Sequence, residues 1–195
     1  MMLKIYIDFR VADALFAIKP TLELCEKYQL PVQWLPIRCD IEAPLIEHSK
    51  ETKGETHARI KQDLASKTNE FYADLYGMKL NPGNLLSADL ALACLLQLTR
   101  RQQDFVEQCI DAFWFQAADL NDESTVREIL SGLSIDQHVD LSEGVSDKLT
   151  QHYMVSMKNH GFLHSPSYVL DESVFIGRQH LPLLERMVRE RLASE

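Results

Sequence analysis

The sequence predicts an α/β protein in which two strand-containing segments enclose a long helical stretch. A strand–helix–strand pattern occupies residues 3–37, helical patterns fill most of residues 57–160, and a strand–strand–helix pattern covers residues 167–193. Strands joined through a helix are expected to be parallel, whereas strands joined by a short turn form an antiparallel hairpin. These three observations predict a mixed sheet with helices inserted between its two halves.

The N-terminal segment shows a strand period, then a helix period, then a strand period again. Residues 3–8 (LKIYID) alternate in part and include β-branched and aromatic side chains, as is typical of a strand. Residues 12–29 place apolar side chains on one helical face, and residues 31–37 (PVQWLPI) predict a second strand. The apolar helix face consists of Leu15, Ile18, Leu22 and Cys25.

The middle of the chain predicts helices joined by loops. Residues 38–56 contain Pro44, Gly54 and many charges, so we expect a mobile loop there. The NPGN stretch at 81–84 predicts a turn, and Gly77 is placed to cap the helix before it. The expected helices cover residues 57–76, Ser87 to about 101, 103–118, 123–132 and 140–160.

Strand patterns return near the C-terminus. SYVL at 167–170 and VFI at 174–176 predict an antiparallel pair joined by a short turn. Gly177 interrupts the second strand, and residues 179–193 predict a terminal helix.

Charge and hydropathy exclude two classes of partner. The net charge of −9, from 20 Lys+Arg and 29 Asp+Glu, argues against a nucleic-acid partner, because phosphate binding needs clustered positive charge. No apolar run approaches the roughly 20 residues that span a bilayer, so we expect no membrane partner. The N-terminus reads as a strand rather than a secretory signal, which predicts a cytoplasmic protein.

The cysteines and histidines do not form a metal-binding pattern. None of the four cysteines belongs to a C-x-x-C pair, and the histidines show no metal-ligand spacing with them. Cys25, Cys94 and Cys109 lie in apolar helical patterns and are expected to be buried and inert. Cys39 follows a predicted strand and is the cysteine to test for reactivity.

Several segments, in order, resemble one superfamily. GFLHSPSYVLDESVFIGRQHLPLLE at 161–185 resembles the C-terminal segment of the DsbA-like families, and IYIDFRVADALFA at 5–17 resembles their first strand and active-site helix. PVQWLPI at 31–37, NPGN at 81–84 and AFWFQAADLNDESTVREIL at 112–130 are similar to further segments of the group. The chain most resembles the 2-hydroxychromene-2-carboxylate isomerases and kappa-class glutathione transferases.

The resemblance implies a thioredoxin-like fold with an inserted all-helical subdomain. The thioredoxin-like domain would comprise residues 1–44 and 156–195, and the insertion residues 45–155. The Ser165–Pro166 peptide bond would be cis and would face the start of the first helix. The resemblance also implies a homodimer, and a small molecule or peptide thiol, with glutathione as a candidate ligand, bound beside Pro166.

Two positions depart from the family pattern. Val11 stands where the relatives have a cysteine nucleophile or a serine that binds the glutathione thiolate, and valine can neither donate a hydrogen bond nor attack an electrophile. Arg178 and Gln179 follow Gly177, where the relatives place an acid that pairs with the glutathione amine. Gln179 offers no charge to an ammonium group, and Arg178 would favour a carboxylate or phosphate.

Three functions therefore stay open. The chain is a glutathione-related isomerase or transferase in which Arg10 and Asp13 are the catalytic candidates, a non-catalytic module that binds a peptide or a small anion, or a disulfide oxidoreductase. The last ranks lowest because the first helix has no sulfur at its start. The residues expected to contact a ligand are Val11, Ala12, Ser165, Pro166, Arg178 and Gln179.

Overall fold

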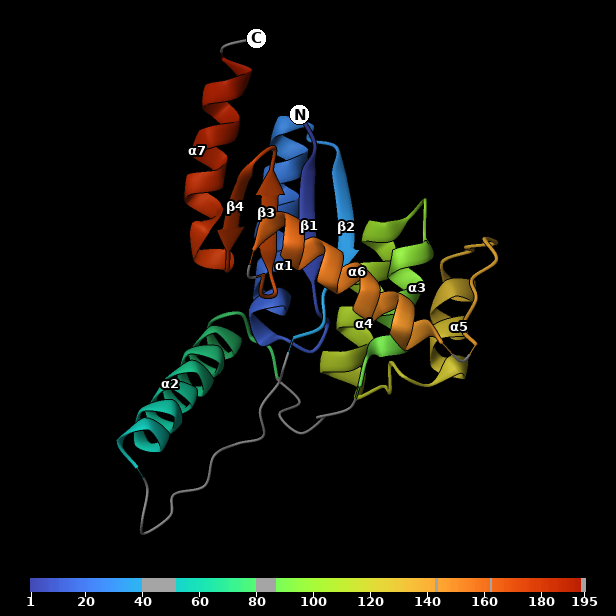
Figure 1. Ribbon diagram of the computed structural model, residues 1–195, viewed down its shortest axis with the longest axis horizontal. Coiled ribbons are helices and arrows are strands. Elements are labelled where there is room, and N and C mark those ends of the chain that lie inside the picture. Colours follow the sequence, from blue (N-terminus) through green and yellow to red (C-terminus); the bar gives the residue numbers. More distant parts are fainter. Residues whose placement is uncertain (40–51, 80–86, 143, 162, 194–195) are drawn as a thin grey trace. The chain divides into compact units, whose positions relative to one another are not determined.

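A computed structural model describes residues 1–39, 52–79, 87–142, 144–161 and 163–193. A four-stranded mixed sheet lies at its centre, in the order β2-β1-β3-β4 (Figure 1). β1 (Leu3–Ile7) pairs in parallel with β2 (Val32–Pro36) and antiparallel with β3 (Ser167–Leu170), and β3 pairs antiparallel with β4 (Ser173–Ile176). The mixed sheet predicted from the sequence is confirmed.

Helices cover both faces of the sheet (Figure 1). Thr21 of α1 (Ala12–Tyr28) lies 3.0 Å from the hydroxyl of Tyr168, which places α1 on one face. The adjacent residue, Val169, points to the other face because side chains alternate along a strand. There it joins a buried cluster against which Tyr153 and Met157 of α6 (Val145–His160) pack. α7 (Leu181–Leu192) follows a 3-10 turn at Arg178–His180 and packs against α1.

Three further helices continue the structure beside β2. They are α3 (Asp89–Gln97), α4 (Gln102–Gln116) and α5 (Glu123–Gly132). The bounds of α5 agree with the predicted 123–132, because Asp122 caps its first turn by accepting a hydrogen bond from the backbone of Thr125.

Two helices are shorter than predicted by more than one turn, for local reasons. α3 ends at Gln97 rather than near 101 because Leu98 is extended and Arg101 adopts a left-handed backbone conformation with φ 57°. α6 begins at Val145 rather than 140 because the Asp140 side chain accepts a hydrogen bond from the backbone of Ser142, which forms a local turn.

α2 (Lys53–Leu75) shows the expected stop signal and an unexpected start. Gly77, with φ 63°, follows the helix, and the backbone N–H groups of Gly77 and Met78 bind the Asp74 and Ala73 carbonyls in a Schellman motif. Thr52 and Glu55 form a capping box, so the helix begins four residues before the predicted 57, within the segment predicted as a loop. The predicted turn at 81–84 lies outside the described residues.

The chain packs as two compact units, one formed by residues 1–39 with 86–195 and the other by residues 40–85. α3 belongs to the first unit because it contacts both β2 and α6. The packing units and the predicted domains are different divisions of the chain, and the predicted boundaries at 44 and 155 stay a prediction. Among the described helices, none is long and apolar enough to cross a membrane.

Candidate functional site

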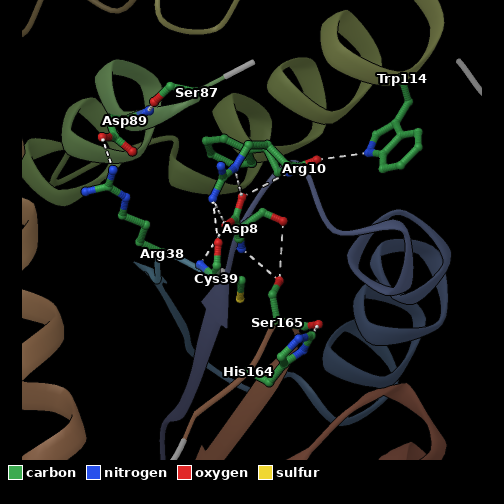
Figure 2. A network of polar contacts seen from close by, with 10 residues as sticks. Asp8, Arg10, Arg38, Cys39, Ser87, Asp89, Trp114, His164 and Ser165 are labelled. Atoms are coloured by element: carbon green, nitrogen blue, oxygen red, sulfur yellow. Dashed lines mark hydrogen bonds and ion pairs between the residues drawn. The ribbon is translucent and has the colours of Figure 1, made fainter. Parts of the chain in front are cut away.

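A buried ion pair organises the end of β1, where the predicted site begins (Figure 2). Asp8 is fully buried, and its carboxylate accepts hydrogen bonds from Arg10 Nε at 3.0 Å and Arg10 Nη2 at 2.7 Å. The same carboxylate accepts the backbone N–H of Cys39 at 2.9 Å. With all of these bonds supplied by the protein, Asp8 is a structural acid.

Arg10 is committed to this network. Its Nη2 also donates to the Cys39 carbonyl at 2.9 Å, and only 11% of its side chain is exposed. Burial lowers the Arg10 pKa, but the hydrogen bond and charge of Asp8, with help from Asp89, leave that pKa raised overall. Arg10 therefore stays charged and holds the loop at Cys39 against the end of β1.

The loop before β3 is attached to the same point. The Ser165–Pro166 peptide bond is cis. The Ser165 hydroxyl accepts the Asp8 backbone N–H at 2.7 Å and donates to the Asp8 carbonyl at 3.3 Å. Ser165 is fully buried, and Pro166 is buried as well. Ser165 thus contributes its hydroxyl to the interior rather than to a ligand.

Val11 is the residue that the resemblance aligns with a cysteine nucleophile or a thiolate-binding serine. It is the N-cap residue of α1, with an extended backbone, and no side chain caps this helix end. Its side chain is half-buried and packs against a cluster of Tyr6, Ile37, Cys39, Leu163 and Val169. The valine therefore extends the hydrophobic core to the start of α1, and the neighbouring Ala12 adds no polar side chain.

Asp13 and Arg178 meet beside this helix end. Arg178 Nε lies 3.0 Å from Asp13 Oδ1, with 18% of the arginine and 39% of the aspartate side chain exposed. The guanidinium carbon lies 5.5 Å from the centre of the Phe16 ring, within range of a cation–π interaction. The turn after β4 thus brings a cation to the first turn of α1, although 165 residues separate the two partners.

Gln179 folds back over the preceding glycine. Its Nε2 donates to the Ile176 carbonyl at 3.1 Å. A Cβ atom at Gly177 would lie 2.3 Å from Gln179 Oε1, and Gly177 has φ 88°. The turn therefore requires glycine for its backbone conformation, and the end of the Gln179 side chain occupies the space beside it.

The cysteines are buried, as predicted for three of them. Burial raises the pKa of Cys25 to about 11 and that of Cys94 to about 12, and it raises the pKa of Cys109 well above its usual value. Cys39 is also buried, with 7% exposed, which argues against the reactivity for which it was singled out. Since the thiolate is the reactive species, none of these thiols is placed for exchange chemistry.

Three residues of the network were missed by sequence reasoning. Trp114 donates its indole N–H to the Phe9 carbonyl at 2.9 Å, and Arg38 lies 3.3 Å from Asp89 (Figure 2). Trp114 falls within the AFWFQ segment that carries part of the resemblance, which was the available signal. No local pattern links Arg38 with Asp89, because the pair forms across the fold.

Comparison with known proteins supports the architecture. No family model and no curated protein matches the sequence. Among solved structures, 2-hydroxychromene-2-carboxylate isomerase matches with a TM-score of 0.71 at 16% identity, covering 100% of both chains. The cytosolic disulfide reductase DsbM from Pseudomonas aeruginosa matches with a TM-score of 0.62 at 16% identity, and its structure with GSH with 0.60 at 15%, each covering 100% of both chains.

These matches define a class of fold. The chain has a thioredoxin-like fold into which helices are inserted between the β-α-β and β-β-α halves. More particularly, the arrangement of its strands and helices is similar to that of 2-hydroxychromene-2-carboxylate isomerase and of DsbM, over the full length of each. At these identities the likeness is one of fold, so function must be argued from the residues.

Proposed function

We propose that this protein binds a small anionic molecule at the N-terminus of α1, beside the Ser165–Pro166 loop, and does not carry out thiol–disulfide exchange. The observation that supports it is the position of Arg178, whose guanidinium group lies against the first turn of α1 at Asp13 and Phe16. The N-terminus of a helix carries partial positive charge, and an adjacent arginine adds to it.

Glutathione is the first ligand to test. It carries two carboxylates, and a structurally similar protein, DsbM, has a structure with GSH. The departures at Val11 and Gln179 remove the sulfur partner and the amine partner that the resemblance would supply, so binding through the carboxylates is the mode that the present residues favour. We expect glutathione to bind more weakly than it does to relatives with complete sites.

Catalysis by an isomerase or transferase mechanism is the second candidate, favoured by the TM-score of 0.71 with 2-hydroxychromene-2-carboxylate isomerase. Arg10, one of the two catalytic candidates, is engaged by Asp8 and Cys39, which leaves Asp13 as the more accessible group. An enzyme of this kind needs a group that donates or accepts a proton close to the ligand. Asp13→Asn should then abolish turnover without abolishing binding.

Calorimetric titration with glutathione and a panel of small carboxylates tests the binding proposal. Arg178→Ala should weaken binding about tenfold, the loss expected for one charge-assisted hydrogen bond. Asp13→Ala should strengthen it, because a competing carboxylate is removed. Arg189→Ala, on the exposed surface of α7, is the matched control and should leave binding unchanged. Equal binding by the wild type and Arg178→Ala would exclude this site.

A disulfide-reduction assay tests the second half of the proposal. The wild type should reduce a model disulfide no faster than its Cys39→Ala variant. A rate like that of a C-x-x-C enzyme would overturn the proposal, and loss of that rate in Cys39→Ala would identify the thiol responsible.

A cytoplasmic location and a homodimer complete the proposal. The location is supported by the N-terminal sequence and by the similar fold of the cytosolic protein DsbM, and the homodimer by the resemblance. Sedimentation velocity at increasing protein concentration tests the assembly. A protein that stays monomeric at high concentration would remove the dimer from the proposal.

A further inference from the structure

A hollow lies along the C-terminal half of α1, away from the helix end discussed above. It is a groove of about 760 Å³ between α1, β2 and the start of α4. Apolar side chains form part of its wall, including Leu22, Leu30 and Val32. The groove lies wholly within the packing unit that contains the sheet.

The groove contains a buried donor without an acceptor. Trp34 belongs to its lining and is 2% exposed, and its indole Nε1 has no hydrogen-bond partner among the described residues. The Trp34 backbone is satisfied separately, because its N–H donates to Gln102 Oε1 at 3.1 Å. This N–H lies beneath the groove surface, so a ligand acceptor can reach it only if the Trp34 ring turns toward the groove. Because a buried N–H group without an acceptor is costly, such a turn would be favourable.

The rim of the groove is rich in further donors. Arg100 and Arg101 line it, against one lining acid, Glu26. α4 begins here, and no side chain caps its N-terminus. The first-turn N–H groups of such a helix lack intrahelical acceptors and favour a negative charge.

The two arginines differ in whether their side chains are free to bind an anion. Arg101 is held in place, since its Nε lies 2.7 Å from Asp104 and its Nη1 donates to the Leu133 carbonyl. Arg100 is exposed and forms no ion pair within the described ranges. Arg100 is therefore the side chain that can turn toward an anion in the groove.

We propose that this groove binds a small organic carboxylate with an apolar body. The apolar body would pack on Leu22, Leu30 and Val32, and the carboxylate would lie between Arg100 and the N-terminus of α4. A turn of the Trp34 ring toward the groove would let its Nε1 donate to an acceptor on the ligand. This site is separate from the one at the N-terminus of α1, and neither proposal depends on the other.

Tryptophan fluorescence reports on the groove directly. The chain has two tryptophans, so Trp114→Phe leaves Trp34 as the only one. Titration of this variant with phenylacetate should change the Trp34 emission saturably, at millimolar concentration or below. Phenylacetamide, which has a similar shape but no charge, should bind much more weakly.

Calorimetry on the otherwise native chain keeps the test independent of the tryptophan variant. Arg100→Glu should weaken phenylacetate binding at least about tenfold, and Trp34→Phe should weaken it to a smaller extent. Arg189→Glu makes the same change of charge outside the groove and should bind as the wild type does. Absence of saturable binding by the wild type, or equal binding by Arg100→Glu, would overturn the proposal. Loss of binding in Arg178→Ala but not in Arg100→Glu would assign the ligand to the N-terminus of α1 instead, and would also overturn it.

Discussion

Two aspartate–arginine pairs lie near the start of α1, and their surroundings differ. Asp8 and Arg10 are two residues apart, with 0% and 11% of their side chains exposed. Asp13 and Arg178 are 165 residues apart, with 39% and 18% exposed. The first pair joins residues that are neighbours in the sequence, whereas the second brings the turn after β4 to the first turn of α1.

The difference in burial suits the two pairs to different tasks: the Asp8–Arg10 pair supports the fold, and the Asp13–Arg178 pair is open to a ligand. The Asp8 carboxylate has its hydrogen bonds supplied by the protein, from Arg10 and Cys39, and water does not reach it. Asp13 and Arg178 retain contact with solvent, so a ligand can compete for either partner. Removing one member of a buried pair strongly destabilises the fold. A half-exposed pair contributes little to stability, and its members can exchange partners.

The largest expected effect comes from breaking the buried pair. Arg10→Met should cost about 3–5 kcal/mol of unfolding free energy, because it leaves the Asp8 carboxylate buried without its charge partner. Urea unfolding measures this loss. Arg178→Met should cost less than about 1 kcal/mol. Equal losses of unfolding free energy in the two variants would show that the two pairs contribute equally to stability.

Removing the Ser165 hydroxyl should have the next largest effect. Ser165→Ala leaves the buried Asp8 backbone N–H without its acceptor, which should cost about 1–3 kcal/mol in the same unfolding experiment. Ser131→Ala, at an exposed position of α5, should stay within about 0.5 kcal/mol of the wild type. A loss in Ser165→Ala no larger than in this control would mean that the hydroxyl does not hold the loop.

Restoring the two ligand-binding groups that the chain lacks should increase its affinity for glutathione. Val11→Ser combined with Gln179→Asp restores the hydroxyl and the acid that the resemblance implies, and glutathione should then bind about tenfold tighter or more. Serine also suits the extended N-cap backbone at position 11, which should offset part of the lost packing. Calorimetry with each single variant would show which position matters, and unchanged affinity in the double variant would count against a degenerate glutathione site.

The smallest expected effect is a pH dependence on the other face of the sheet. Burial lowers the pKa of His152 from 6.5, and its ring is stacked on Tyr6, with the ring centres 6.4 Å apart. A lowered pKa in the folded state means that the unfolded chain takes up the proton first. The contribution of the neutral imidazole is therefore complete above pH 6.5 and is lost as pH falls through the folded-state pKa.

Unfolding free energies measured between pH 7 and pH 5 should show this decline in the wild type and a shallower one in His152→Phe. The two ion pairs are best compared at pH 7 or above, where the titration of His152 does not make the unfolding free energy depend on pH. The same slope in both proteins would assign the decline to other groups.

The sheet and most helices could be predicted from the sequence because their signals are local. SYVL at 167–170 forms β3 with the predicted bounds, and α5 agrees with 123–132. The ends of α3 and α6 differed because single side chains and left-handed residues such as Arg101 decide where a helix stops. Helical periodicity does not contain that information.

The site was harder to predict because its chemistry depends on burial. Arg10 reads as an available cation in the sequence, and only the fold shows that its guanidinium group is bound by Asp8 and the Cys39 carbonyl. The Asp13–Arg178 pair joins two predicted site residues, yet nothing local predicts that they neutralise each other. The resemblance pointed to the start of α1, and it could not state how the charges there are paired.

The pairing of β1 with β3 has a consequence for synthesis of the protein. β1 is complete when residue 7 leaves the ribosome, but its antiparallel neighbour begins at residue 167. Until then one edge of β1 and the backbone of Asp8 lack their partners, so a nascent chain can form the β-α-β unit and the helices but not the finished sheet. Residues 167–176 complete the sheet, and chains released before this segment should expose the edge of β1 to aggregation or to degradation.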